Sequence, residues 1–285
     1  MGLIDFILNL AGVLVWLSWR SLRFDPLVKT TPATLVGTLR RAEPRRMKGW
    51  QSLAGLAALL VLRALLYRQI GPEADWTPRL NLFFVAPPFS SHRFSHMMLF
   101  SLLSFARILI VCYFWLLALA IINRRSPEPD PLQKMVRLHL GPVARWPWPL
   151  QLLLPLLLIT GLWVSFHPLF VHLEIASPVR SNVHLAEQGI LIATALCFSL
   201  QYLLPVFLFL HLVASYVYLG SSPLWELINA TARNLLAPLR RLPLRIAKFD
   251  FAPLIGVILI FALLHLLPKL VLGEMALHNL SSWPP

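Results

Sequence analysis

The chain has 285 residues, of which 58% are apolar and 13% are charged, and its formal net charge is +13. Soluble domains carry about 25% charged residues, so this composition excludes an ordinary soluble protein and indicates an integral membrane protein. The two cysteines, Cys112 and Cys197, lie in apolar runs without the spacing of a metal site, which indicates small buried apolar residues.

Six apolar runs approach or exceed the length of about 20 residues that a helix needs to cross the membrane core. We expect membrane spans over 3–19, 50–67, 97–122, 149–166, 188–219 and 252–272. The first run holds Asp5 and no cation before Arg20, so it lacks the basic start of a cleavable signal peptide and should be retained. The fifth is long and contains Pro205, so we expect a kink there, with a split into two short segments as the alternative.

The cations are concentrated on the three alternate connections that follow the first, third and fifth spans. These connections carry 18 of the 25 Lys and Arg residues and a net charge of +12. Since Lys and Arg in short loops favour the cytoplasm, we expect the three connections to be cytoplasmic and both termini to face outward. Anionic lipid headgroups are the expected partner of this charge. Nucleic acid, the other usual partner of a basic protein, is not needed to explain it.

The three basic connections also resemble one another in the order of their residues. Each follows aromatic residues at the end of a span, starts with a proline-containing turn and ends in a basic segment that contains proline. The turn proline and the basic segment are 14, 14 and 17 residues apart, from Pro26 to Arg40, Pro131 to Arg145 and Pro223 to Arg240. This periodicity predicts three repeated helix pairs that all point the same way across the membrane.

We therefore expect an all-α membrane protein with about six transmembrane helices, arranged as three helix pairs in a single membrane domain over 1–285. The expected parts are repeat 1 over 1–70, an outward loop over 71–95, repeat 2 over 96–170, an outward loop over 171–186, repeat 3 over 187–273 and an outward tail over 274–285.

Each connector is expected to contain an amphipathic helix. In the third copy Pro223 suits a first helical turn, Leu227 and Ile228 lie near one face, and Pro238 ends the helix. Such a helix can lie at the membrane interface with its arginines near phosphates, and packing on protein is the alternative. The residues expected to contact lipid or a partner are Arg40, Arg41, Arg145, Arg240, Arg241, Arg245 and Lys248.

The third connector reads "PLRR" at 238–241 and then "DFAP" at 250–253, directly before the last apolar run. This order resembles the signature of the YggT family of small bacterial and plastid membrane proteins, which is Pro-[IL]-Arg-Arg followed by Asp-x-Ser-Pro. The matching residues are Pro238, Arg240, Arg241, Asp250 and Pro253, with Ala252 in place of Ser and "RIAK" in place of the family's glycines. The resemblance covers about 60 residues of the third repeat, so the chain looks like an enlarged relative of that family.

The resemblance implies a non-enzymatic multi-pass protein of a bacterial inner membrane, with a role in membrane assembly or scaffolding. Bacterial members of the family are linked to cell division, envelope processes and osmotic tolerance, and plastid members to haem attachment on cytochrome b6. The expected partners are lipid and either another membrane protein or a second copy of the chain, with no cofactor. The sequence agrees with this, because it has no phosphate loop, nucleophile elbow, His-Glu-x-x-His or Cys-x-x-Cys motif.

Four polar residues lie inside the apolar runs: Asn9, Arg63, Arg107 and His211. An arginine in a span is costly and should face a partner, and Glu187 is the carboxylate expected to be nearest to Arg63 and Arg107. Asn9, Arg107 and His211 lie seven or eight residues before the aromatic cluster of their spans. If the repeats are real, the three side chains meet at one centre, which makes a transporter or channel the alternative function.

The histidines raise a third alternative, haem or metal handling. They include His92 and His96, which can share a helix face, and three that fall on the predicted outward side, His167, His172 and His184. Their spacing lacks a tight ligand pattern, so we expect interfacial or solvated histidines and predict no metal site.

Overall fold

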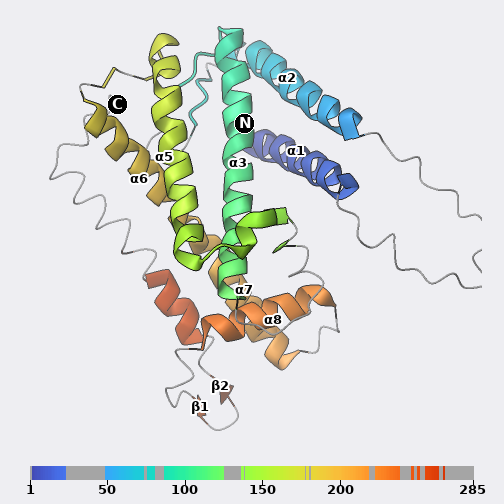
Figure 1. Ribbon diagram of the computed structural model, residues 1–285. Coiled ribbons are helices and arrows are strands. Elements are labelled where there is room, and N and C mark those ends of the chain that lie inside the picture. The colour runs from blue at the N-terminus through green and yellow to red at the C-terminus, as the bar shows by residue number, and fades with distance from the viewer. Residues whose placement is uncertain are drawn as a thin grey trace, which may run out of the picture. The chain divides into compact units, whose positions relative to one another are not determined.

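The computed structural model describes residues 2–23, 49–73, 76–80, 87–124, 136–137, 139–176, 178–179, 181–217, 222–237, 245–246, 249–250, 254–262 and 266. Figure 1 shows its helices, which are α1 (Gly2–Arg23), α2 (Gly49–Glu73), α3 (Phe94–Ile122), the 3-10 helix η2 (Gly141–Arg145), α5 (Trp148–His172), α6 (Asn182–Phe198), α7 (Leu200–Tyr216) and α8 (Pro223–Leu235). The strands β1 (Arg245–Ile246) and β2 (Phe249–Asp250) form a short antiparallel pair. Apart from this pair, the regular structure of the described residues is helical, as predicted.

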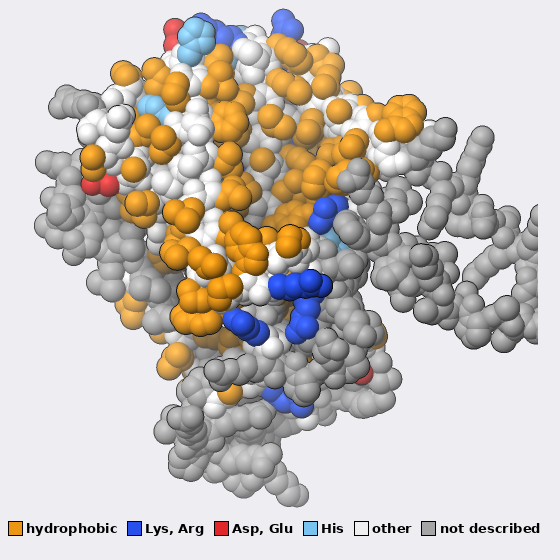
Figure 2. All heavy atoms as spheres, in the orientation of Figure 1, with side chains coloured by type: hydrophobic (Ala, Val, Ile, Leu, Met, Phe, Trp, Pro, Cys, Tyr) orange, Lys and Arg blue, Asp and Glu red, His pale blue; other side chains and the backbone are white. Residues whose placement is uncertain are grey.

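Five apolar helical segments among the described residues are long enough to cross a membrane: Gly2–Arg20, Gly49–Glu73, Phe94–Ile122, Trp148–His172 and Asn182–Ser215. They coincide with the first five predicted spans. Hydrophobic side chains are widespread over the described surface on the face shown in Figure 2, as expected for helices that contact lipid. In the sixth predicted span only 254–262 and 266 are described, and they are helical, so its full length stays a prediction.

The chain divides into two compact units, Met1–Leu80 with Pro88–Ile110 and Asn81–Pro87 with Val111–Pro285. The boundary falls inside α3, which contributes its first half to the first unit and its second half to the second. The boundary between the units does not coincide with a boundary between the predicted helix pairs. The three repeats stay a prediction.

In the first unit, α1 packs along α2, and the first half of α3 completes the core. Leu56 and Leu60 of α2 and Phe105 of α3 are buried together, with Trp16 of α1 against them. Gly12 permits a close approach, because a Cβ atom at this position would lie 2.9 Å from Cε2 of Phe105. The small residue therefore lets the backbone of α1 come near the ring on α3.

An aromatic group closes the connection between α2 and α3. The ring of Tyr67 lies 5.1 Å from that of Trp76 and 5.9 Å from that of Phe100, and the Phe89 ring lies 5.5 Å from Phe100. The backbone N–H of Phe89 donates to the carbonyl of Pro78 at 2.9 Å, which holds the two sides of the connection together. These contacts fix the end of α2 near the start of α3 and position Tyr67.

In the second unit, α5 and α6 form an antiparallel helical hairpin (Figure 1). α5 ends in a Schellman motif, in which the N–H of Ile175 donates to the carbonyl of Phe170 at 2.9 Å and both side chains are buried. Glu174 takes the left-handed position with φ of 59°, where glycine is usual. The hairpin also depends on Gly189, since a Cβ atom there would lie 2.9 Å from Cγ2 and 3.1 Å from Cα of Thr160.

The fifth predicted span is interrupted at Ser199, where α6 ends and α7 begins. This interruption agrees with the alternative of two shorter segments, since α6 and α7 have 17 residues each. Pro205 lies inside α7, and a kink there stays a prediction. The backbone N–H groups of Ser199 and Tyr202 donate to carbonyls three residues earlier, so the helix tightens locally toward 3-10 geometry. The Ser199 hydroxyl accepts a hydrogen bond from the Trp115 indole of α3 at 3.0 Å, which ties the junction to the second half of α3.

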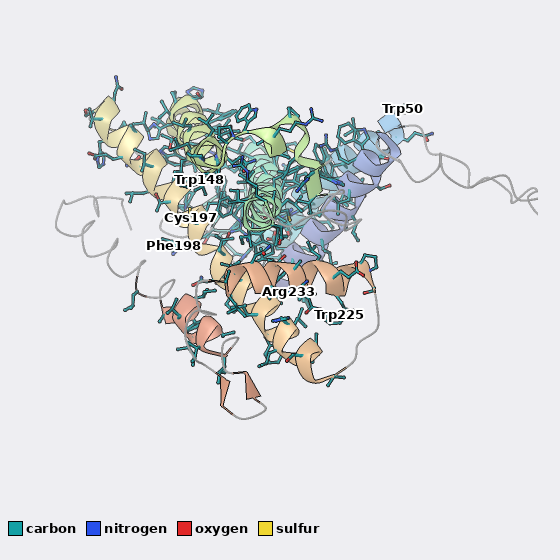
Figure 3. All side chains as sticks on the ribbon, turned by 60° about the horizontal axis from the view of Figure 1, so that its bottom comes forward. Trp50, Trp148, Cys197, Phe198, Trp225 and Arg233 are labelled. Carbon is teal, nitrogen blue, oxygen red and sulfur yellow. The ribbon has the colours of Figure 1, made fainter. Side chains whose placement is uncertain are left out.

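The connector helix expected after Pro223 is confirmed as α8, with Pro223 in its first turn. Its apolar face is covered by protein, because Ala232 and Leu236 are buried against Leu208 of α7. The alternative of packing on protein therefore describes this face better than the expected burial in lipid. The opposite face carries the exposed side chain of Arg233, labelled on α8 in Figure 3.

The close contact at Gly189 can be tested by replacing it with alanine. We expect Gly189→Ala to destabilise the α5–α6 hairpin by about 1–3 kcal/mol, because the added methyl group meets the backbone of Thr160. Gly161→Ala is the matched control in α5, where a Cβ atom meets nothing within 4 Å, so it should be neutral or slightly stabilising. Thermal unfolding of the detergent-solubilised variants, followed by circular dichroism, checks both. Equal stability of the two variants would contradict this packing.

Candidate functional site

A buried ion pair joins two helices of the first unit. Nη2 of Arg63 on α2 donates to Oδ1 of Asp5 on α1. The Arg63 side chain is fully buried, whereas that of Asp5 keeps 21% of its surface exposed. Because charges in an apolar surrounding are costly without a partner, the pair strongly favours the docked position of α1 on α2.

Three more side chains complete the coordination of the carboxylate. The Tyr67 hydroxyl donates to Oδ1 of Asp5 at 3.0 Å, and Nδ2 of Asn9 and the Ser104 hydroxyl approach Oδ2 at 3.2 and 3.3 Å. With Arg63 the carboxylate thus receives four donors from three helices. We call these five residues, Asp5, Asn9, Arg63, Tyr67 and Ser104, the ion-pair cluster.

The guanidinium of Arg63 is held as firmly as the carboxylate. Nη1 donates to Oδ1 of Asn9 at 2.8 Å, and Nε donates to the Tyr67 hydroxyl at 3.3 Å. The guanidinium carbon lies 5.4 Å from the ring centre of Tyr67 and 5.9 Å from that of Phe100, which is the range of cation–π attraction. Hydrogen bonds and aromatic rings together fix its orientation.

Local helix geometry explains why the cluster forms here. Asp5 and Asn9 are four residues apart on α1, and Arg63 and Tyr67 are four residues apart on α2, so each pair lies on one helix face. Ser104 of α3 also accepts from Nδ2 of Asn9 at 3.1 Å. The polar groups of the cluster bond to one another in a closed network. Such a network stabilises helix packing and is less suited to binding and converting a substrate.

Arg107 lies three residues beyond Ser104, on the same side of α3, and is partly buried. It interacts electrostatically with both Asp5 and Arg63. The structure therefore joins two of the predicted intramembrane polar residues, Asn9 and Arg63, to one carboxylate by hydrogen bonds, and Arg107 lies on the same helix face as Ser104 of that cluster.

Several polar side chains of the second unit form hydrogen bonds between helices. Nδ1 of His211 on α7 lies 2.7 Å from Oδ1 of Asn229 on α8. Nδ2 of Asn123, at the end of α3, donates to the Thr231 hydroxyl at 2.7 Å, and its Oδ1 accepts from Asn234 at 2.9 Å. These bonds hold α8 against α3 and α7. His211 belongs to the second unit, so its predicted meeting with Asn9 and Arg107 stays a prediction.

The expected carboxylate partner of Arg63 was wrong. Asp5 forms the pair, whereas Glu187 lies 3.4 Å from Nδ1 of His184 in the second unit. Sequence reasoning also missed Tyr67 and Ser104. The four-residue spacing of polar residues within α1 and within α2 was the available signal, since it predicts polar faces directed at each other.

The predicted lipid or partner contacts lie mostly outside the described residues. Arg145 is described and exposed at the end of η2. Arg245 and Asp250 oppose each other in the β1–β2 pair, which concerns their backbones. The residues outside the described part are Arg40, Arg41, Pro238, Arg240, Arg241, Lys248 and Pro253.

Within the described part of the chain, no group of three or more His, Cys, Asp or Glu side chains is arranged to hold a metal ion. No family model, curated protein or solved structure matches the chain. The long apolar helices indicate a helical membrane protein, and the ion-pair cluster and the exposed cations are the features of the described residues that bear on its function.

The ion-pair cluster predicts a large penalty for removing one charge alone. Asp5→Asn should destabilise the protein by about 3–5 kcal/mol, because it leaves the fully buried Arg63 guanidinium without its counter-charge. Arg63→Gln should cost less, because the Asp5 carboxylate is partly exposed and keeps three other hydrogen-bond donors. The double variant Asp5→Asn/Arg63→Gln should recover a substantial part of this loss.

A double-mutant cycle on thermal unfolding in detergent measures the coupling between the two positions. Arg68→Gln serves as the matched control, since Arg68 is an exposed cation on the same helix and should change stability little. Additive effects of Asp5→Asn and Arg63→Gln would contradict the pairing.

Proposed function

We propose that the chain is a non-enzymatic multi-pass protein of the bacterial inner membrane, of the YggT type, that serves as a membrane assembly or scaffolding factor. The observation that supports this role is that the polar groups of the ion-pair cluster bond to one another. The Asp5 carboxylate accepts four hydrogen bonds, all from side chains of α1, α2 and α3. Polar groups that hold a bundle in one shape suit a protein that presents a fixed surface to its partners.

The surface that would meet lipid or a partner is basic and aromatic. Arg145 is exposed, and Trp146 and Trp148, which follow it at the start of α5, are 41% and 56% exposed. Trp148 is labelled in Figure 3. Tryptophan is enriched where a helix leaves the hydrocarbon, and an adjacent arginine suits anionic headgroups or an acidic partner segment. The same chemistry is expected of the basic segment around Arg240 and Arg241.

A transporter or channel is the second candidate. The observation that favours it is the incomplete burial of Asp5, whose side chain stays 21% exposed while Arg107 adds a second positive charge nearby. Charged groups inside spans frequently mark a pathway for ions or protons. This candidate needs the cluster to open, whereas scaffolding needs it to stay closed.

Neutralising the basic segment tests the scaffolding role. Arg240→Gln/Arg241→Gln should reduce the capture of membrane partners severalfold, because the segment loses two of the cations proposed to attract acidic groups of a partner. Crosslinking of native membranes followed by mass spectrometry measures this capture. The matched control is Arg68→Gln/Arg79→Gln, which removes two exposed cations from the side predicted to face outward. Unchanged capture in the first variant would speak against the proposal.

The orientation of the chain can be tested with reporter fusions. A periplasmically active phosphatase fused after Pro285 should be active, because the charge distribution places the C-terminus outward. The same reporter fused after Asp130 should be inactive, since the second basic connection is expected in the cytoplasm. The reverse pattern of activity would overturn the predicted topology.

A further inference from the structure

The turn before α5 carries an exposed arginine and two exposed tryptophans on a backbone that hydrogen bonds hold in place. Arg145 ends η2, and Trp146 and Trp148 follow it. Next to them the Gln151 side chain is buried, and its Nε2 donates to the carbonyl of Val143 in η2 at 2.9 Å. The backbone N–H of Trp146 donates to the same carbonyl at 3.2 Å. These two bonds join η2 to the first turn of α5. We call Arg145, Trp146 and Trp148 the junction patch.

The start of α5 places the junction patch at the edge of the hydrocarbon. Trp148 is the first residue of α5, which is apolar and long enough to span a membrane. Arg145 lies three residues earlier, so its Cα atom is at most about 11 Å from that of Trp148. The headgroup layer on each side of a bilayer is about 5–8 Å thick. The Arg145 side chain therefore reaches the lipid phosphates, and tryptophan rings are typical of the same layer.

The charge of this part of the chain suits an anion. The sequence from 131 to 173 contains no Asp or Glu. The N-terminus of α5 adds the positive end of a helix dipole beside Arg145. A guanidinium presents paired N–H donors that match two oxygens of a phosphate, and it stays charged at every physiological pH. The junction patch is therefore complementary to a phosphate at the level of the headgroups.

The backbone of the junction disfavours an acidic peptide as the occupant. Trp146 and Pro147 are extended, which is the conformation that can pair with a peptide strand. Pro147 and Pro149 have no N–H, however, and the N–H of Trp146 is bonded to the carbonyl of Val143. A peptide laid along this segment would find few backbone donors. Recognition has to use the guanidinium and the indole rings, and a lipid headgroup with its acyl chains satisfies both.

We propose that the junction patch binds the phosphate of an anionic glycerophospholipid. Arg145 donates to the phosphate oxygens, and the rings of Trp146 and Trp148 pack against the glycerol and the upper part of the acyl chains. The inference deepens the proposed function and rests on it, because it names lipid as the partner of one basic surface of the scaffold. A bound lipid would fix the depth of α5, since Gln151 ties η2 to the first turn of that helix.

Lipid binding can be measured on the full chain in detergent by native mass spectrometry, with phosphatidylglycerol and phosphatidylcholine titrated separately. The wild type should bind phosphatidylglycerol more tightly than phosphatidylcholine. Arg145→Gln should weaken the binding of the first phosphatidylglycerol by roughly fivefold, the effect of one cation near an anionic headgroup, and leave phosphatidylcholine unchanged. Arg145→Lys should lose less affinity, because it keeps the charge but not the paired donors.

Arg124→Gln is the matched control. Arg124 is an exposed cation of the same unit, two residues after α3, and has no tryptophan next to it in the sequence. Its replacement should leave the affinity for phosphatidylglycerol unchanged. Because Arg145 is exposed, Arg145→Gln should also unfold at the wild-type midpoint by circular dichroism, which separates lost binding from lost folding. Wild-type affinity in Arg145→Gln, no preference for phosphatidylglycerol, or an equal loss in Arg124→Gln would overturn the proposal.

Competition identifies the source of the phosphate. Inorganic phosphate at millimolar concentration should not displace the lipid from the wild type, because it lacks the acyl chains that contact the rings. Displacement would overturn the proposal in favour of a soluble ligand. The scaffolding role is tested separately by partner capture through Arg240 and Arg241. Lost lipid binding with intact capture would therefore reject this inference alone, and lost lipid preference together with unchanged capture in Arg240→Gln/Arg241→Gln would reject both.

Discussion

The pairing of Asp5 with Arg63 is the constraint on which the arrangement of the first unit depends. Neither charge is tolerable in a span by itself, and neither can leave its helix, so the two helices have one favourable register. Asn9, Tyr67 and Ser104 then have defined positions because they bond to that pair. Apolar packing of α1 on α2 would allow sliding or rotation at small cost, whereas the ion pair does not.

The second unit is held by a different kind of interaction. Asn123, Thr231 and Asn234 bond without formal charge, as do Trp115 and Ser199. Neutral hydrogen bonds between membrane helices contribute about 0.6 kcal/mol on average, so each is weak and the set acts together with apolar contacts such as those of Leu208. The first unit therefore depends on one strong interaction, and the second on several modest ones.

The features predicted correctly from the sequence are those that depend only on residues close together in the chain. Five spans follow from the length of apolar runs, and the start of α8 follows from Pro223, whose fixed φ suits the first turn of a helix. The need of Arg63 for a partner could also be anticipated. The identity of that partner could not, because Asp5 is 58 residues away and the pairing depends on how α1 is rotated against α2.

The junction in the fifth span shows the same limit. Proline chemistry drew attention to Pro205 alone and did not predict the interruption at Ser199, where Trp115 of another helix donates to the serine hydroxyl. Local backbone rules name residues that can disturb a helix, and tertiary hydrogen bonds help to decide where it is disturbed. The burial of the apolar face of α8 on α7 is likewise a tertiary outcome, since an amphipathic pattern suits a lipid surface and a protein surface equally well.

The order of the cluster residues along the chain bears on how the protein is made. Asp5 leaves the ribosome 58 residues before Arg63 and 99 residues before Ser104. When α1 first meets the bilayer, its carboxylate therefore has neither of these partners. Stable entry of α1 has to wait for α2, and the two helices enter most favourably as a neutral hairpin, with α3 adding its hydroxyl afterwards. The nascent chain thus gains a folded first unit only when the third helix has been synthesised.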